Sequence, residues 1–213
     1  MIITVSKPVD ELLTMLQPFN RVFIVGCGEC ATVCQTGGEE QVKRMANELS
    51  KLKEVVGVTV IESPCDERLV RRDLKNTAEM NNIDAFLVMS CGIGVQTISE
   101  ATGAICIPAL DTKFMGKVEK IGRFYERCRA CGECILYETG GICPITRCAK
   151  GLLNGPCGGQ ANGKCEVGNW QNDCAWVLIH QRLKEIGQLN RFKKFREPRD
   201  YQLKAGPGEV IWR

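Results

Sequence analysis

The sequence predicts an α/β fold in which a doubly wound, mostly parallel sheet is followed by an irregular, cysteine-rich metal-binding region and a C-terminal helix. Three observations support this. Short apolar runs alternate with amphipathic segments up to about residue 110. Several cysteines of this half directly follow an apolar run. From about residue 118, glycine and cysteine replace regular periodicity.

Helices and strands are expected to alternate in the first half. A proline at the start and acidic residues in the first turn favour a helix over residues 8–19. The other segments with helical periodicity are 39–54, 66–81 and 95–103. The apolar runs of strand length are 21–26, 56–62, 84–90 and 104–110. This order implies parallel strands joined by helical crossovers, so we expect a Rossmann-like domain over residues 1–117.

Cysteine dominates the composition, with 14 among 213 residues. The sequence has no visible secretory signal and no long apolar run, so we expect a cytoplasmic protein without membrane insertion. Disulfide scaffolds are typically short and secreted, so this cysteine content favours metal ligation. The single histidine, His180, excludes zinc fingers that need two histidines and makes histidine acid–base catalysis improbable. A net charge of +3 does not call for nucleic acid as a partner.

The stretch "IVGCGECATVC" contains three cysteines, Cys27, Cys30 and Cys34, directly after an apolar run. Cys65 and Cys91 follow the next two predicted strands. Because carboxyl ends of parallel strands share one edge of a sheet, these five thiols are expected to converge there. A [4Fe–4S] cluster needs four cysteines, so the triad supplies three ligands, and either Cys91 or Cys65 supplies the fourth.

Other interpretations of this region carry less weight. Gly26, Gly28, Gly92 and Gly94 are expected to let the backbone approach a bulky inorganic ligand. The pattern lacks the glycine spacing of nucleotide-binding loops. A thioredoxin-type dithiol at Cys27 and Cys30 is the stronger alternative, and the additional cysteines argue against it. Cys106 lies within a predicted strand and is expected to be structural.

Residues 118–190 form a second predicted domain, and residues 128–174 of it hold eight cysteines. Such a segment buries too little apolar surface to fold alone, so metal is expected to stabilise it. Its first three cysteines have ferredoxin spacing, and the fourth precedes a proline as in ferredoxins, although the loop before it is longer. These four are Cys128, Cys131, Cys134 and Cys143. The other four, for which iron and zinc both remain open, are Cys148, Cys157, Cys165 and Cys174.

The chain is expected to end in a helix over residues 173–189 and an extended arm over 191–213. His180 lies beside the apolar face of that helix and is expected to be a packed or hydrogen-bonded residue rather than a metal ligand. The arm mixes basic and aromatic residues, which single-stranded nucleic acids can bind. We favour an arm that docks on another subunit, because aromatic residues in an extension suit an interface.

Four stretches, "VGCGECATVCQTGG", "SPCDERLV", "SCGIGVQT" and "GGICPITRCAKGLLNGPCGG", resemble the C-terminal domain family associated with methylenetetrahydrofolate reductase. This resemblance implies a non-catalytic iron–sulfur subunit of the oxidoreductase complex of one-carbon metabolism in acetogenic bacteria. It would pass electrons from ferredoxin, or another donor subunit, to the FMN of a MetF-type flavoprotein in the Wood–Ljungdahl pathway.

The resemblance assigns one cluster to Cys27, Cys30, Cys34 and Cys91 (or Cys65), and a second site to the Cys128–Cys174 set. At least two [4Fe–4S] clusters are then expected, with zinc as the alternative at one C-terminal site. Two other functions remain open. One is a zinc-stabilised structural or assembly subunit, and the other is a stand-alone thiol oxidoreductase that uses Cys27 and Cys30.

Overall fold

The computed structural model describes residues 1–75, 82–200 and 208–211, and it divides into two compact units, Met1–Tyr125 and Glu126–Arg213. The first unit contains a parallel four-stranded sheet in the order β3-β2-β4-β5. Its strands are β2 (Arg21–Cys27), β3 (Glu54–Ile61), β4 (Ala85–Met89) and β5 (Cys106–Pro108). The mixed α/β fold with a parallel sheet is therefore confirmed.

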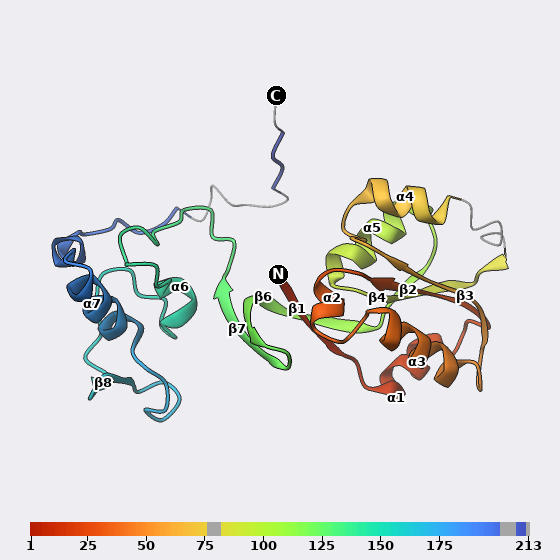
Figure 1. Ribbon diagram of the computed structural model, residues 1–213, viewed down its shortest axis with the longest axis horizontal. Coiled ribbons are helices and arrows are strands. Elements are labelled where there is room, and N and C mark those ends of the chain that lie inside the picture. Colours follow the sequence, from red (N-terminus) through yellow and green to blue (C-terminus); the bar gives the residue numbers. More distant parts are fainter. Residues whose placement is uncertain (76–81, 201–207, 212–213) are drawn as a thin grey trace. The chain divides into compact units, whose positions relative to one another are not determined.

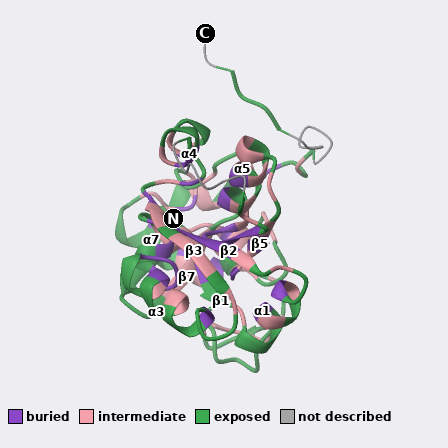
Figure 2. Ribbon diagram, turned by 90° about the vertical axis from the view of Figure 1, so that its right-hand side faces the viewer, coloured by how far each residue is buried: buried purple, intermediate pink, exposed green. Residues whose placement is uncertain are grey.

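Helices cover both faces of this sheet, as Figure 1 shows. Alternate residues of β2 and β4 face opposite ways because successive strand side chains point to opposite sides. Val22 and Ile24 pack with α1 (Val9–Leu16) and α3 (Glu39–Leu49). Phe23 and Val25 pack with α4 (Glu67–Leu74) and α5 (Gly92–Thr102). The buried residues gather on the strands and on the helix faces turned toward them (Figure 2).

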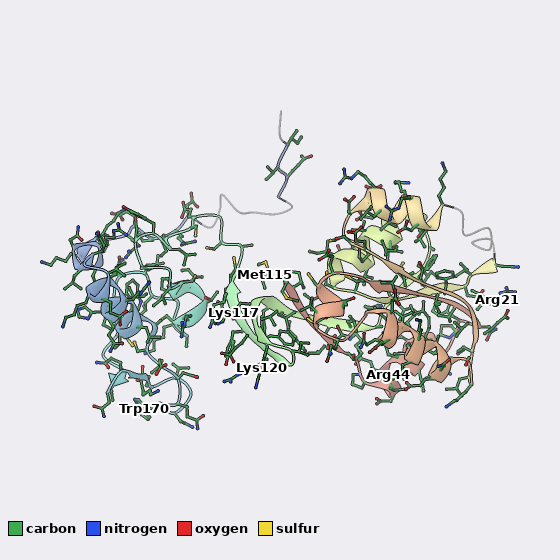
Figure 3. All side chains as sticks on the ribbon, viewed as in Figure 1. Arg21, Arg44, Met115, Lys117, Lys120 and Trp170 are labelled. Carbon is green, nitrogen blue, oxygen red and sulfur yellow. The ribbon has the colours of Figure 1, made fainter. Side chains whose placement is uncertain are left out.

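A second sheet, which the sequence analysis did not predict, has the strand order β1-β6-β7. Its strands are β1 (Ile2–Ser6), β6 (Leu110–Lys120) and β7 (Arg123–Cys128). β1 runs antiparallel to β6, with Ile2 opposite Met115. Met115, Lys117 and Lys120 are labelled along β6 in Figure 3.

Several boundaries differ from the sequence prediction. α3 ends at Leu49 rather than at residue 54, because the chain turns at Ser50 and enters β3 at Glu54. α5 begins at Gly92 rather than at 95, with Cys91 as its N-cap. The strand predicted over 104–110 is split between β5 and β6. The last part of the helix predicted over 66–81 lies outside the described residues.

The second unit has little regular structure. It contains α6 (Pro144–Arg147), the short hairpin β8 (Gln160–Ala161) and β9 (Lys164–Cys165), and α7 (Ala175–Glu185), which is the C-terminal helix, followed by the 3-10 helix η2 (Leu189–Lys193). One small core forms around Trp176, Ile179 and Leu183. None of the helices in the described ranges has the length and apolar character needed to cross a membrane.

The described part of the predicted arm, up to residue 200, packs on its own chain. Phe192 makes edge contacts with Trp176 and His180, at ring-centroid distances of 5.8 Å and 5.2 Å. The buried Arg196 side chain pairs with Glu138 at 2.7 Å. This contact fastens the arm to the cysteine-rich unit.

Candidate metal centre

The carboxyl ends of β2 and β4 form the point where the parallel sheet reverses its winding. From β2 the chain crosses to β3 on one side, and it then returns to β4 on the other side of β2. Ligands of open α/β sheets bind in the crevice at such a reversal. Cys27 is the last residue of β2, and Cys91 follows β4 by two residues. Both cysteines are therefore placed at the crevice.

The segment from Cys27 to Gly37, here called the cysteine loop, folds back on itself. The Cys27 N–H donates to the Gly37 carbonyl at 2.9 Å, and the Thr36 N–H donates to the Ala31 carbonyl at 2.9 Å. Between these bonds lies the single helical turn α2 (Cys30–Val33). The loop therefore brings Cys30 and Cys34 back toward the end of β2.

Gly37 packs the cysteine loop directly against β4. A Cβ at this position would collide with the Met89 carbonyl and lie 2.9 Å from the Ala31 Cβ. Met89 ends β4 two residues before Cys91. A side chain at position 37 would thus separate the loop from the strand that leads to Cys91.

Backbone N–H groups point at two of the sulfurs. The backbone amides of Ala31 and Glu29 favour the thiolate form of Cys27 and so lower its pKa. The Ile2 N–H donates to Cys30 Sγ at 3.4 Å, and Cys34 Sγ donates to the Ile2 carbonyl at 3.8 Å. Amide donors of this kind stabilise thiolates and are one of the features that tune iron–sulfur clusters.

Cys91 acts electrostatically on the Cys27 thiol. Burial raises the pKa of the Cys27 thiol, the amide donors oppose this, and the charges of Cys30 and Cys91 raise it further. Cys27, Cys34 and Cys91 are buried. Cys65 is exposed, and its thiol contacts Ser63 Oγ at 3.3 Å. Cys30 and Cys91 thus lie near enough to Cys27 to act on its thiol electrostatically, and Cys34 lies on the same loop.

Three of the four glycines that we expected near a ligand have contacts within the protein. A Cβ on Gly26 would lie 2.6 Å from the Gly37 carbonyl, and one on Gly94 would collide with Ser90. The Gly92 N–H is occupied by Thr112 Oγ1 at 2.9 Å. Gly26 and Gly94 are thus explained by packing. Cys106 lies half-buried in β5 and packs against the core that contains Phe23 and Val25, as expected of a structural cysteine.

In the second unit, the first four cysteines lie on loops and at element ends. Cys128 ends β7, and its thiol accepts the Ala130 N–H at 3.4 Å. The Arg199 guanidinium donates to the carbonyls of Cys131 and Glu133 at 3.3 Å and 2.7 Å. Cys134 is exposed, and Cys143 is the N-cap of α6. The arm thus fixes the backbone of the loop that carries Cys131.

The other four cysteines are linked through one local network. The Cys165 N–H donates to the Asn172 carbonyl at 2.8 Å, and the Cys174 N–H donates to the Gly163 carbonyl at 2.7 Å. This antiparallel pairing makes Cys165 and Cys174 diagonal neighbours on one face. Cys148 packs against the small core that contains Cys174. Lys150 contacts both Cys157 and Glu166, the residue after Cys165.

The donor chemistry at both places, which is cysteine thiol, fits sulfur-bound metal. Within residues 1–75, 82–200 and 208–211, no three His, Cys, Asp or Glu side chains approach closely enough to hold a single ion. The four cysteines of a [4Fe–4S] cluster bind four different irons, so they are spread around the cluster. By ligand type, the four thiols of Cys27, Cys30, Cys34 and Cys91 suit such a cluster.

Sequence reasoning missed two residues of this site, Ile2 and Gly37. Ile2 reaches Cys30 and Cys34 only because β1 pairs with β6, more than a hundred residues away in the chain. The available signal was the apolar stretch "MIITV" before the first predicted helix. For Gly37 the signal was the Gly37–Gly38 pair that closes the cysteine loop.

Comparison with known proteins gives one match. Residues 107–202 match the model of a family described as "Methylene-tetrahydrofolate reductase C terminal". The matched region begins in β5 and includes the eight cysteines of the second unit, whereas the cysteine loop and Cys91 precede it. Neither a curated protein nor a solved structure matched the chain. The part of the chain from residue 107 to 202 is thus similar to the methylene-tetrahydrofolate reductase C-terminal family.

Proposed function

We propose that this chain is an iron–sulfur electron-transfer subunit, of the MetV kind, in a methylenetetrahydrofolate reductase complex. One [4Fe–4S] cluster would be held by Cys27, Cys30, Cys34 and Cys91. A second metal site would lie among the cysteines of the second unit. The MetF-type partner would carry FMN, and ferredoxin or another subunit would donate the electrons.

The observation that carries the proposal is the set of amide donors around clustered, buried thiols at the sheet reversal. Ala31 and Glu29 direct N–H groups at Cys27, and Ile2 directs one at Cys30. Four thiolates in a water-poor crevice need such donors to offset their charge. The family match over residues 107–202 independently supports the reductase context.

The proposed roles of the chain's own residues are to bind, to orient and to exclude water. When bound, the cluster supplies one-electron transfer, which suits a flavin that accepts one or two electrons. Gly37 keeps the cysteine loop against β4, so that Cys91 can join the triad. The burial of Cys27, Cys34 and Cys91 limits water at the sulfurs.

The test is anaerobic purification of the chain with its flavoprotein partner, followed by metal analysis and EPR. We expect about eight irons per chain for two clusters, and an EPR signal after dithionite reduction. Reduced ferredoxin should then reduce the partner's FMN only when this chain is present. A colourless, EPR-silent protein that contains only zinc would refute the proposal.

A second candidate function is a zinc-held assembly module, which the network around Cys148, Cys157, Cys165 and Cys174 favours. Cys174 belongs to the small core of α7 and Cys148 packs against it, while Cys165 is joined to the same region by backbone pairing. An all-cysteine site there would supply stability that the core lacks. One zinc per chain with four irons would assign zinc to this set and a cluster elsewhere, whereas zinc without iron would leave assembly as the function.

The thiol oxidoreductase alternative is disfavoured by the environment of Cys27. An attacking cysteine needs a lowered pKa and access to its substrate. Burial instead raises the pKa of Cys27, whose thiol lies in the interior of the unit. A Cys30→Ser variant separates the two cases, because a cluster ligand loses iron and colour while a dithiol loses only turnover.

A further inference from the structure

The edge of β1 faces the cysteine loop. β1 lies at the end of its sheet, paired with β6 on one side, and α2 packs on its other side (Figure 1). At Ile2 both backbone polar groups point toward the loop. The N–H donates to Cys30 Sγ at 3.4 Å, and the carbonyl accepts from Cys34 Sγ at 3.8 Å.

Several contacts hold the Ile2 amide in this position. Thr4 Oγ1 and Thr36 Oγ1 share a buried hydrogen bond of 2.7 Å, which ties β1 to the cysteine loop. Thr36 Oγ1 also donates to the Ala31 carbonyl at 3.3 Å. On the other side, Gly116 N–H donates to the Met1 carbonyl at 3.0 Å. The amide is thus fixed from both β6 and the loop, so its direction toward Cys30 is built into the fold.

We propose that the Ile2 backbone N–H tunes the reduction potential of a cluster bound through Cys30, which makes Ile2 a positioning residue for that ligand. The inference rests on the proposed function. Reduction adds one electron to the cluster and increases the negative charge on its sulfurs. A fixed N–H dipole stabilises this reduced form more than the oxidised form, and so raises the potential.

The two contacts of Ile2 respond differently when the cysteines bind iron. Ligation removes the thiol proton of Cys34, so that side chain can no longer donate to the Ile2 carbonyl. The Ile2 N–H keeps its proton, and its bond to Cys30 becomes charge-assisted and therefore stronger. The Ile2 N–H is thus the contact of β1 that persists once the cysteines bind the cluster.

The first test compares Ile2→Pro with Ile2→Val in the complex with the flavoprotein partner. Proline lacks the N–H, and because this N–H points away from β6, the substitution removes no bond of the ladder. Valine keeps the N–H and the strand propensity. An EPR redox titration should give Ile2→Pro a lower potential, by up to about tenfold in the one-electron equilibrium, or about 59 mV. Ile2→Val should match the unmodified protein.

A second measurement does not depend on the proline variant folding. Protein labelled with nitrogen-15 isoleucine should show a nitrogen-15 coupling to the reduced cluster in pulsed EPR, transmitted through the Ile2 N–H. In equally labelled Ile2→Val, the amide at position 2 is unlabelled, so this coupling should disappear while the potential stays unchanged.

The outcomes separate the inference from the proposed function. If the cluster-containing protein has the same potential in both variants, or if the nitrogen-15 coupling survives Ile2→Val, the inference is wrong. The proposed function then still stands. An unmodified protein that contains no iron overturns both. A lowered potential in Ile2→Pro together with loss of the coupling in Ile2→Val supports the inference.

Discussion

The two units place their cysteines by different means. The first unit buries apolar side chains on both faces of a sheet, and its cysteine loop lies on an edge that this core already fixes. The second unit has one small core built from α7, and its cysteines lie mostly on loops and element ends. In the first unit the fold positions the cysteines, whereas the second unit has little core to do so, and the metal proposed for it would add that stability.

The glycines show the same contrast. Gly26 and Gly37 in the first unit permit close approach of backbone segments. In the second unit, Gly151 and Gly155 have positive φ angles of 63° and 108° and open space where a side chain would be. Glycine there allows sharp turns rather than tight packing. Interior packing thus explains Gly26 and Gly37 near the cysteine loop, while turn geometry explains Gly151 and Gly155.

Metal removal should give the largest effect, and it should be confined to one unit. Anaerobic chelation is expected to unfold residues 126–213 and to leave the parallel sheet of the first unit intact. All three tryptophans, Trp170, Trp176 and Trp212, belong to the second unit, so tryptophan fluorescence reports on it alone. Hydrogen exchange should show fast exchange in that unit and retained protection in β2 and β4. Equal hydrogen-exchange protection of both units after chelation would show that the second unit does not depend on metal more than the first.

The next largest effect should separate Cys91 from Cys65. Cys91→Ser is expected to remove the cluster of the first unit, because Cys91 is buried and acts electrostatically on Cys27. Cys65→Ser is the matched control and should keep full iron, because Cys65 is exposed and contacts Ser63. Iron per chain and the EPR signal measure both. If Cys65→Ser loses iron and Cys91→Ser keeps it, the ligand assignment is wrong.

Gly37→Ala should show how tightly the first unit is packed. The added methyl collides with the Met89 carbonyl, so we expect a loss of about 1–3 kcal/mol in stability and reduced iron in the cysteine loop. Gly158→Ala in the second unit meets open space and should change stability by less than about 0.5 kcal/mol. Denaturant unfolding, followed by circular dichroism, measures both variants. Equal effects would show that the two glycines are not distinguished by packing.

The smallest expected effect is a pH dependence of the arm. The pKa of Glu138 lies below its usual value of 4.5 because of hydrogen bonds from Lys194 and then Arg196. Its stabilising contribution is complete above the unfolded pKa and is lost as the pH falls through the folded pKa. The arm should therefore loosen only as the pH falls from 4.5 through the lower, folded pKa of Glu138. Trp176 fluorescence can follow this, since the Arg196 guanidinium lies 5.7 Å from its ring centroid. Glu138→Gln should lack the transition.

The sequence predicted the parallel sheet well because its signals are local. The apolar runs at 21–26 and 84–90 become strands that are buried almost throughout. The run at 56–62 has strand length and strand-forming residues, although only Ile61 of β3 is buried. The β1-β6-β7 sheet escaped prediction for the opposite reason. β6 is charged and largely exposed, and its pairing with β1 joins segments separated by about a hundred residues. Neither feature leaves a periodic pattern in the chain.

The candidate site was partly predictable in the same way. Strand order explains why Cys27 and Cys91 could be placed on one edge from their positions after apolar runs. The sequence left open whether Cys91 or Cys65 lies near the triad. The answer depends on which strand lies beside β2 on the side of the cysteine loop, and sequence spacing does not encode strand order. Ile2 and Gly37 act through backbone contacts, so their side-chain types did not indicate a role at the site.

The reactivity of the Cys106 thiol can report how often the parallel sheet of the first unit opens. Burial in β5 raises the pKa of this thiol to about 11, so it stays protonated at neutral pH while the unit is folded. Once the strand leaves the sheet, the thiol regains ordinary reactivity toward alkylating reagents. When the other thiols are bound to metal or chemically blocked, the rate at which Cys106 is alkylated therefore measures the rate at which the parallel sheet opens.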